Sequence, residues 1–151
     1  MELDNNKINS AKRHCVRHRI YYSDTDCGKV VYYANYLKYF EIGRTELLRS
    51  VGIELERYHQ QDIIFVVVRV EIDYKSSAHY NDDLKIYSAI VDYNKKFFTV
   101  YNEIFNQADK LLVKGFTKCA CVCAKTGKII NTPEEIQNAF ADYRRTQFGG
   151  W

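Results

Sequence analysis

One interval of the chain has the apolar spacing of a long helix. Between residues 35 and 51, apolar side chains recur at helical spacing on one face, and Gly52 follows as a natural stop. Gly43 lies inside this interval, although glycine costs about 1 kcal/mol relative to alanine in a helix. A glycine at that place indicates the close approach of another backbone, which we expect to belong to a sheet.

The remaining apolar residues follow strand patterns. Ile63–Val68 is a continuous apolar run, which is typical of a strand buried on both faces. Short polar turns between the strands favour an antiparallel meander. The expected strands cover residues 15–22, 63–74, 84–93, 97–106 and 111–125.

The last element begins with a strong helix signal. Thr132 suits the N-cap, Pro133 the first helical position and Glu135 the capping box, so a helix is expected from Pro133 to about Arg145. The whole pattern predicts an α+β fold, in which one long central helix packs on a five-stranded antiparallel sheet and a second helix ends the chain. The free edges of such a sheet favour pairing with a second copy, so a homodimer is expected.

The ends of the chain differ from its middle. Residues 1–13 are polar and residues 148–151 contain two glycines, so we expect a loosely ordered arm and tail around one domain at residues 14–147. The first residues lack the pattern of a secretion signal, and no apolar run reaches the roughly 18 residues of a membrane helix. A cytoplasmic protein without membrane insertion is therefore expected.

Composition and charge exclude some partners. The net charge is +3, and Lys and Arg are spread along the chain, which argues against nucleic acid but leaves room for a small anionic ligand. The five cysteines fit reduced thiols better than disulfides. On a strand, Cys119, Cys121 and Cys123 lie too far apart to share one metal ion well, so buried structural roles are expected. We expect neither a metal nor another cofactor.

Two carboxylates lie close together in the polar loop that follows the first strand. Asp24 and Asp26 stand just before an apolar pair and an aromatic run that opens the long helix. A carboxylate beside a helix N-terminus can act as a base or nucleophile, while the helix N–H groups can hold an oxyanion. Acyl transfer requires that combination. Turn and capping roles are an equally open explanation of the two aspartates at this point.

The same loop and helix start resemble the signature of a known family. The segment is similar to that of the 4-hydroxybenzoyl-CoA thioesterase family of hotdog proteins, and most similar to the acyl-CoA thioesterases associated with the bacterial Tol-Pal system. The order of elements fits over residues 14–140. The resemblance implies the hotdog fold, in which the sheet wraps the long helix. It rests on Tyr22, Asp24, Asp26, Val30, Val31, Tyr32, Asn35, Tyr36, Glu41 and Arg44.

The resemblance also implies an activity, the hydrolysis of an acyl-CoA to free acid and CoA. Asp26 takes the place of the catalytic aspartate, which either attacks the thioester or activates a water. Tyr33 takes the place of the residue whose backbone N–H polarises the thioester carbonyl. Short-chain aliphatic and hydroxyaryl acyl groups both stay open as substrates.

Further positions of the family pattern imply contacts with the substrate. Val31, Tyr32 and Asn35 would contact the substrate beside Asp26. Lys95 and Lys96 resemble a basic turn that contacts the nucleotide of CoA in relatives, although a solvated turn would have the same composition. The family further implies a site built at the interface of a homodimer, and assembly into a homotetramer.

Departures from the pattern keep other interpretations open. Lys29 stands where the family has glycine, so the loop backbone beside Asp26 is expected to differ, and Ser77 replaces a proline. The alternatives are a thioesterase acting on acyl carrier protein, and a non-catalytic hotdog module that binds acyl-CoA or a protein partner. A hotdog dehydratase is disfavoured because no histidine lies in the signature loop. Glu41, expected to pair with Arg44, is a second candidate for catalysis.

Overall fold

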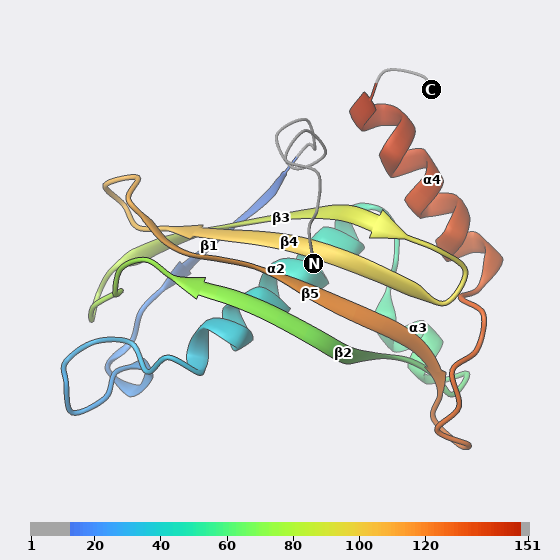
Figure 1. Cartoon of the computed structure of the whole chain (residues 1–151), viewed down its shortest axis with the longest axis horizontal. Helices are drawn as coiled ribbons and strands as arrows, with labels where there is room; N and C mark the ends of the chain where they lie inside the picture. The colour runs from blue at the N-terminus through green and yellow to red at the C-terminus, as the bar shows by residue number, and fades with distance from the viewer. Residues whose placement is uncertain (1–12, 149–151) are drawn as a thin grey trace.

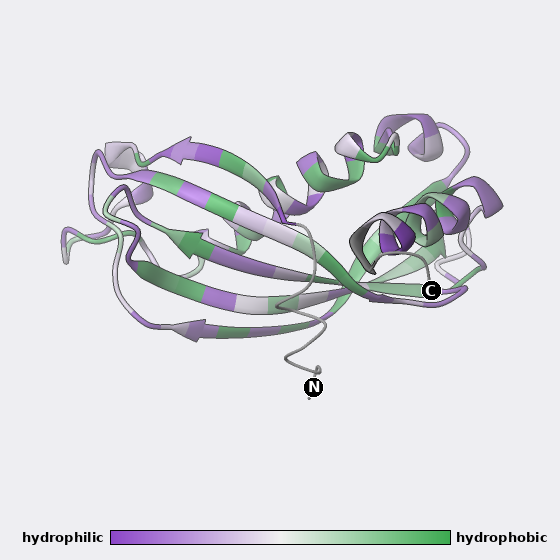
Figure 2. Ribbon diagram, turned by 90° about the horizontal axis from the view of Figure 1, so that it is seen from above, coloured by the Kyte–Doolittle hydropathy of each residue, from purple (hydrophilic) through white to green (hydrophobic). Residues whose placement is uncertain are grey.

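A curved antiparallel sheet carries the long helix α2 on one face (Figures 1 and 2). The computed structural model describes residues 13–148, and its five strands lie in the order β1-β3-β4-β5-β2. This is the α+β architecture predicted from the sequence. The strands are β1 (His14–Arg19), β2 (Ile63–Tyr74), β3 (Asp83–Tyr93), β4 (Phe97–Phe105) and β5 (Leu111–Cys123). The helices are α2 (Asn35–Ser50), α3 (Leu55–His59) and α4 (Glu134–Phe148), with a 3-10 turn η1 at Tyr22–Asp24.

The order of the strands corrects the expected meander. Strands β3, β4 and β5 follow one another as neighbours, but β2 pairs with β5 at the far edge of the sheet. The chain must therefore cross the sheet between β2 and β3. Two local elements were also not predicted: the short helix α3, and the 3-10 turn η1 that ends the first strand at Arg19 rather than Tyr22.

Helix α2 lies unusually close to the sheet at Gly43. A Cβ placed on Gly43 would lie 2.4 Å from Ser88 Oγ and 2.7 Å from Ile86 Cγ2, both on β3. Gly115 of β5 also allows α2 to lie close to the sheet. A Cβ on Gly115 would lie 3.0 Å from the ring of Phe40 on α2 and 2.2 Å from a backbone carbonyl of β2. The glycine inside the helix thus marks the predicted close approach to the sheet, although the sheet atoms next to Gly43 belong to side chains rather than to another backbone.

The core lies between α2 and the sheet and has two parts. One cluster fills the space below the first half of α2, around Tyr36 and Phe40. The other fills the space below its second half and is closed by Phe140 of α4. Phe40 and Leu47 are each 1 % exposed, and burial of such a side chain contributes about 1.5–3 kcal/mol. These clusters hold α2 in place along its whole length.

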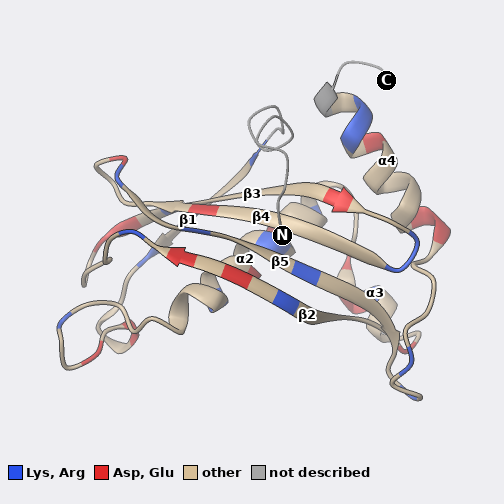
Figure 3. Ribbon diagram, viewed as in Figure 1, with Lys and Arg blue, Asp and Glu red and all other residues tan. Residues whose placement is uncertain are grey.

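The apolar run in β2 is more exposed than the sequence suggested. Val66, Val67, Val68 and Val70 are 37–49 % exposed, so the prediction of a strand buried on both faces is wrong for the single chain. The reason is that β2 is an edge strand with only β5 as a neighbour. Charges appear only in its second half (Figure 3), which leaves the first half as an uncharged edge.

Part of the chain lies outside the described residues. The expected arm and tail fall there except for their innermost residues. Of these, Arg13 pairs with Glu103 of β4, and Phe148 is the last residue of α4. None of the helices between residues 13 and 148 has the length and apolar content needed to cross a bilayer.

The contact at Gly43 makes a prediction about stability. Helix propensity alone would make Gly43→Ala more stable by about 1 kcal/mol. Because the added methyl would collide with Ser88 and Ile86, we expect the free energy of unfolding to fall by about 1–3 kcal/mol instead. Urea unfolding of this variant measures the sign. Lys38→Ala, on the exposed side of α2, is the control and should change little; a more stable Gly43→Ala would contradict the close approach.

Candidate active site

The loop between η1 and α2 folds into a tight turn around Asp26. The backbone N–H of Asp26 donates to the carbonyl of Val30 at 2.9 Å, and the N–H of Lys29 donates to the carbonyl of Asp26 at 3.0 Å. The N–H of Gly28 donates to Asp26 Oδ1 at 2.7 Å. The loop therefore fixes both the backbone and the side chain of Asp26. The carboxylate remains exposed to solvent.

Lys29 occupies the position at which the family pattern has glycine, and the glycine of this turn stands one place earlier, at Gly28. Lys29 has φ 63°, which is the left-handed conformation that glycine adopts readily and lysine rarely. A Cβ on Gly28 would lie 3.0 Å from Asp26 Oδ1, so the missing side chain there leaves room for the carboxylate. The turn is thus built at Lys29 against the preference of its residue type.

Asp24 has a structural role that separates it from Asp26. Its Oδ2 accepts the backbone N–H of Tyr21 at 2.9 Å. Its carbonyl accepts the N–H of Tyr32 at 3.1 Å and the side-chain amide of Asn35 at 2.9 Å. The turn-and-cap interpretation therefore applies to Asp24. Asn35, expected to contact substrate, has its amide N–H directed to this loop carbonyl and helps to position the loop against α2.

Backbone contacts hold the loop against the connection between β2 and β3. The N–H of Val31 donates to the carbonyl of Ala78 at 2.9 Å, and Val30 forms an isolated bridge with His79. The N–H of Ala78 in turn donates to the hydroxyl of Tyr36 on α2 at 3.0 Å. One connection, between β2 and β3, thus contacts both the Asp26 loop and the helix.

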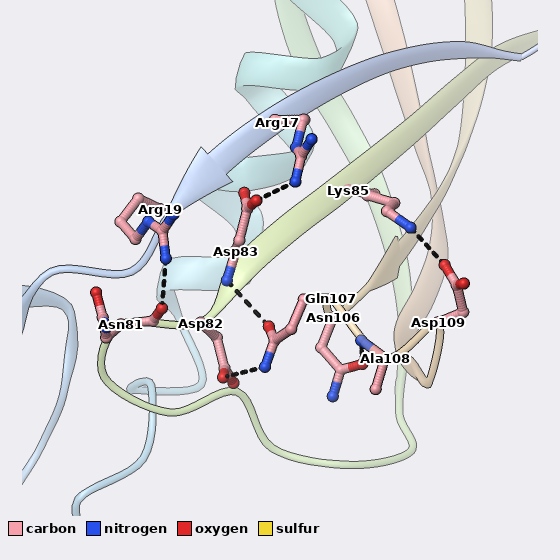
Figure 4. A network of polar contacts seen from close by, with 10 residues as sticks. All are labelled: Arg17, Arg19, Asn81, Asp82, Asp83, Lys85, Asn106, Gln107, Ala108 and Asp109. Carbon is pink, nitrogen blue, oxygen red and sulfur yellow. Dashed lines mark hydrogen bonds and ion pairs between the residues drawn. The ribbon is translucent and has the colours of Figure 1, made fainter.

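A polar network braces that connection from the other side (Figure 4). Gln107, in the turn between β4 and β5, accepts the backbone N–H of Asp83 at 3.1 Å and donates to Asp82 Oδ1 at 3.0 Å. Arg19 of β1 donates to the carbonyl of Asn81 at 2.9 Å. Two separate segments, the β4–β5 turn and β1, therefore keep the connection in place, and through it the Asp26 loop.

Asp26 and Tyr33 open onto a common groove of about 330 Å³. Within residues 13–148 the backbone N–H of Tyr33 donates to no acceptor, while its carbonyl accepts the hydroxyl of Tyr74 at 3.0 Å. An unpaired N–H at the start of α2 is a suitable donor to a substrate oxygen. The groove is lined by Asp26, Val30, Val31, Tyr33, Tyr36, Tyr74, Lys75, Ser76 and Ser77.

The tyrosines around the groove are donors rather than bases. Burial raises the pKa of Tyr36 and of Tyr74 above the usual value for tyrosine. The neighbouring hydroxyl of Tyr33 is the main reason that the pKa of Tyr32 is raised. All three therefore stay protonated near neutral pH. Among the groove residues, this leaves the Asp26 carboxylate to accept a proton or attack a carbonyl.

The predicted substrate contacts are only partly brought together within one chain. Val31 is buried against the groove, and the exposed ring of Tyr32 stacks beside Tyr33 with 4.9 Å between centroids. Lys95 and Lys96 lie elsewhere, in the turn between β3 and β4 at the opposite end of the sheet (Figure 1).

The register of the sheet gives the size of that separation. The carbonyl of Lys96 accepts the N–H of Cys121, and Cys121 pairs with Phe65 of β2. The groove lies at the other end of the same strand, beside Tyr74. From Phe65 to Tyr74 the strand rises about 30 Å, so one chain does not place both lysines at its own groove.

The structure also tests the predictions made for Glu41 and for the cysteines of β5. Glu41 accepts the hydroxyl of Thr45 at 2.7 Å, and within residues 13–148 the expected ion pair with Arg44 is not formed. Cys119 and Cys121 are buried as predicted, and burial raises the pKa of both thiols.

A larger hollow of about 550 Å³ lies between α2 and α4 and is lined by none of the predicted site residues.

Comparison with known proteins identifies the family to which this fold and groove belong. Residues 21–140 match the family described as the thioesterase-like superfamily. The chain belongs to this superfamily. It is 34% identical over 123 residues to the putative acyl-CoA thioesterase YneP of Bacillus subtilis, covering 81% of this chain and 86% of that protein. It is 36% identical over 123 residues to the acyl-CoA thioesterase YbgC of Haemophilus influenzae, covering 81% and 90%.

A solved structure agrees with the fold. The DHNA-CoA thioesterase from Staphylococcus aureus superposes with a TM-score of 0.85 at 24% identity, covering 87% of this chain and 91% of that one. The expected hotdog fold is therefore confirmed.

Sequence reasoning did not assign the groove wall formed by the end of β2. Tyr74, Lys75 and Ser76 line the groove with Asp26 but were expected only as strand and turn residues. Their place follows from the crossing of the sheet after β2, which no local pattern predicts. The available signal was the family pattern around Ser77, which stands in place of a proline.

The conformation of Lys29 makes a second prediction about stability. Relief of a left-handed non-glycine residue is worth about 1–2 kcal/mol, and the greater freedom of an unfolded glycine offsets about half of it. We therefore expect Lys29→Gly to raise the free energy of unfolding by about 0.5–1 kcal/mol in urea titrations. Lys95→Gly, at an exposed lysine whose φ is not positive, is the matched control and should lower it. A loss of stability in Lys29→Gly would contradict the argument.

Proposed function

We propose that this chain hydrolyses acyl-CoA thioesters, with Asp26 as nucleophile or general base and the N–H of Tyr33 as donor to the thioester carbonyl. The observation that carries the proposal is the groove that combines an exposed carboxylate with an unpaired N–H at the start of α2. Asp26 is held by hydrogen bonds within its own turn and the Tyr33 backbone by the hydroxyl of Tyr74 on β2, so both need little rearrangement to act. The names of the related YneP and YbgC proteins support the same activity.

Two chemical routes fit this arrangement. In the first, an Asp26 oxygen attacks the carbonyl carbon, the C–S bond breaks, CoA leaves as a thiolate that takes a proton from solvent, and water hydrolyses the mixed anhydride. In the second, Asp26 takes a proton from a water that attacks the same carbon, the C–S bond breaks, and the departing CoA thiolate takes up a proton from Asp26 or solvent. In both, the carbonyl oxygen gains negative charge and the N–H of Tyr33 stabilises it.

The finer expectations stay predictions. The choice between short-chain aliphatic and hydroxyaryl acyl groups, the similarity to the Tol-Pal-associated thioesterases and the cytoplasmic location belong to this group. An acyl carrier protein substrate and a non-catalytic binding module are the alternatives to the proposed activity. What argues against the non-catalytic module is that Asp26 and Tyr33, whose backbone N–H is unpaired within residues 13–148, both line the groove.

We further propose that two copies pair through the edges of β2. The exposed valines lie at the middle of this edge, and an antiparallel pairing through a two-fold axis there would bury them and continue the sheet. The same axis brings the end of β2 near Tyr74 beside the opposite end of the second copy's β2. The basic turn at Lys95 and Lys96 of one copy then lies at the groove end of the other, where it can meet the phosphates of CoA. A homotetramer stays a prediction.

The role of Asp26 is tested by Asp26→Asn. The substitution keeps the size and the acceptor for the Gly28 N–H but removes the charge, so we expect kcat to fall by about 10²- to 10⁴-fold with the fold unchanged. Thiol release from a panel of acyl-CoA thioesters measures the rate. Asp92→Asn, an exposed aspartate on β3, is the control and should retain the wild-type rate. A near-normal rate in Asp26→Asn would remove Asp26 from the mechanism.

The role of the β2 edge is tested by Val68→Lys. Val68 is 49% exposed in the single chain, so a lysine there costs the monomer little, but two copies would place like charges in an apolar contact. We expect the assembly to shift toward monomers in analytical ultracentrifugation and the activity to fall with it. Asn138→Lys, which adds the same charge on α4, is the control. Unchanged sedimentation of Val68→Lys would place the interface elsewhere.

A further inference from the structure

Lys29 is a charged side chain at a backbone position that favours glycine. It lies three residues after Asp26, is exposed, and has φ 63°. Such outliers gather at functional sites, where a particular side chain is worth the strain of the backbone. Gly28 stands next to it in the same turn, so the chain uses glycine beside the carboxylate and lysine at the strained position. This arrangement calls for a role for the lysine side chain.

The charges around the groove show what that role can be. Within residues 13–148 neither Lys29 nor Lys75 forms an ion pair, whereas Lys85 and Lys125 do. Lys75 lines the groove, and Lys29 adjoins the groove residue Val30 in the Asp26 turn. Asp26 is the only carboxylate among the residues that line the groove. Lys75 therefore lines, and Lys29 directly precedes a residue that lines, a groove whose own negative charge would otherwise repel an anionic substrate.

The position of Lys29 limits which part of a substrate it can reach. The carbon of the thioester must meet the Asp26 carboxylate or a water beside it. The phosphates of CoA are separated from the thioester by the whole pantetheine arm, which is uncharged. An anion close to Lys29 therefore belongs to the acyl group.

We propose that Lys29 is a specificity-determining residue that binds a carboxylate carried by the acyl group, with Lys75 as the second cation of the same subsite. The substrates favoured by this subsite are monothioesters of dicarboxylic acids. The inference rests on the proposed thioesterase function and concerns only the choice of acyl group. A neutral acyl chain makes no ionic contact with either lysine, so the two classes of substrate differ in their dependence on the charge at position 29.

The test compares two thioesters of equal chain length, adipoyl-CoA and hexanoyl-CoA, which differ in the terminal carboxylate. The measured quantity is the ratio of kcat/KM for the two esters by thiol release, corrected for hydrolysis without enzyme. In Lys29→Asn, asparagine tolerates the left-handed conformation but lacks the charge. We expect the ratio of adipoyl to hexanoyl hydrolysis to fall about threefold to fivefold, the effect of losing one exposed ion pair. The difference between wild type and variant should shrink in about 1 M salt, where charges are screened.

Control variants separate the charge from the backbone. Lys29→Arg should restore most of the ratio, and Lys38→Gln, at an exposed lysine of α2 away from the groove, should leave it at the wild-type value. The same ratio in Lys29→Asn and wild type would overturn the role of Lys29 while leaving the thioesterase intact. No thiol release by wild type from adipoyl-CoA would overturn the proposed subsite, and no release from any member of the acyl-CoA panel would contradict the proposed function itself.

Discussion

The close contact of α2 with the sheet at Gly43 is the constraint on which the rest of the structure depends. Because Gly43 has no side chain, the helix backbone rests directly on the side chains of Ser88 and Ile86, and the large residues on either side fill the two halves of the core. The helix can then neither rise from the sheet nor rotate on it without opening cavities. Its first turn is thereby fixed at one end of β2.

The candidate site is a consequence of that fixed helix start. The Asp26 loop is suspended between the first turn of α2 and the β2–β3 connection, and Tyr36 and Ala78 join those two supports directly. Its geometry is therefore carried by a helix and a sheet rather than by the loop alone. A small hydrolytic site benefits from such support because errors of position near the reacting atoms are costly in rate.

The sequence predicted the parts of this arrangement that depend on neighbouring residues. The helix and its stop at Gly52 followed from periodicity, and the close approach at Gly43 from a residue type that a helix alone does not favour. The same reasoning could not place β2 at an edge, because a continuous apolar run has the same appearance whether it is covered by the same chain or by another. It also could not show that Asp24 has a structural role, since that role lies in contacts with Tyr21 and Asn35 that form only after the loop closes.

The left-handed lysine of the loop shows a related limit. The sequence shows that lysine replaces the family glycine at position 29. It does not show whether the loop backbone changes or whether lysine adopts the strained left-handed conformation. Here the residue accepts it, because the bonds from Asp26 to Val30 and from Lys29 to Asp26 close the turn regardless of the side chain. The hydrogen bonds of the turn stabilise it by more than the left-handed conformation of Lys29 costs.

The apolar edge of β2 also affects the chain during synthesis, before two copies have paired. Ile63–Val68 combines β-branched residues, no charge and no proline, which is the composition of segments that stack into cross-β fibrils. An edge strand of this kind is a template for whichever strand arrives first. During synthesis at high local concentration, correct pairing therefore competes with aggregation. The charged residues Arg69, Glu71 and Asp73 follow in the second half of the strand. They limit the aggregation-prone segment to the first half of β2.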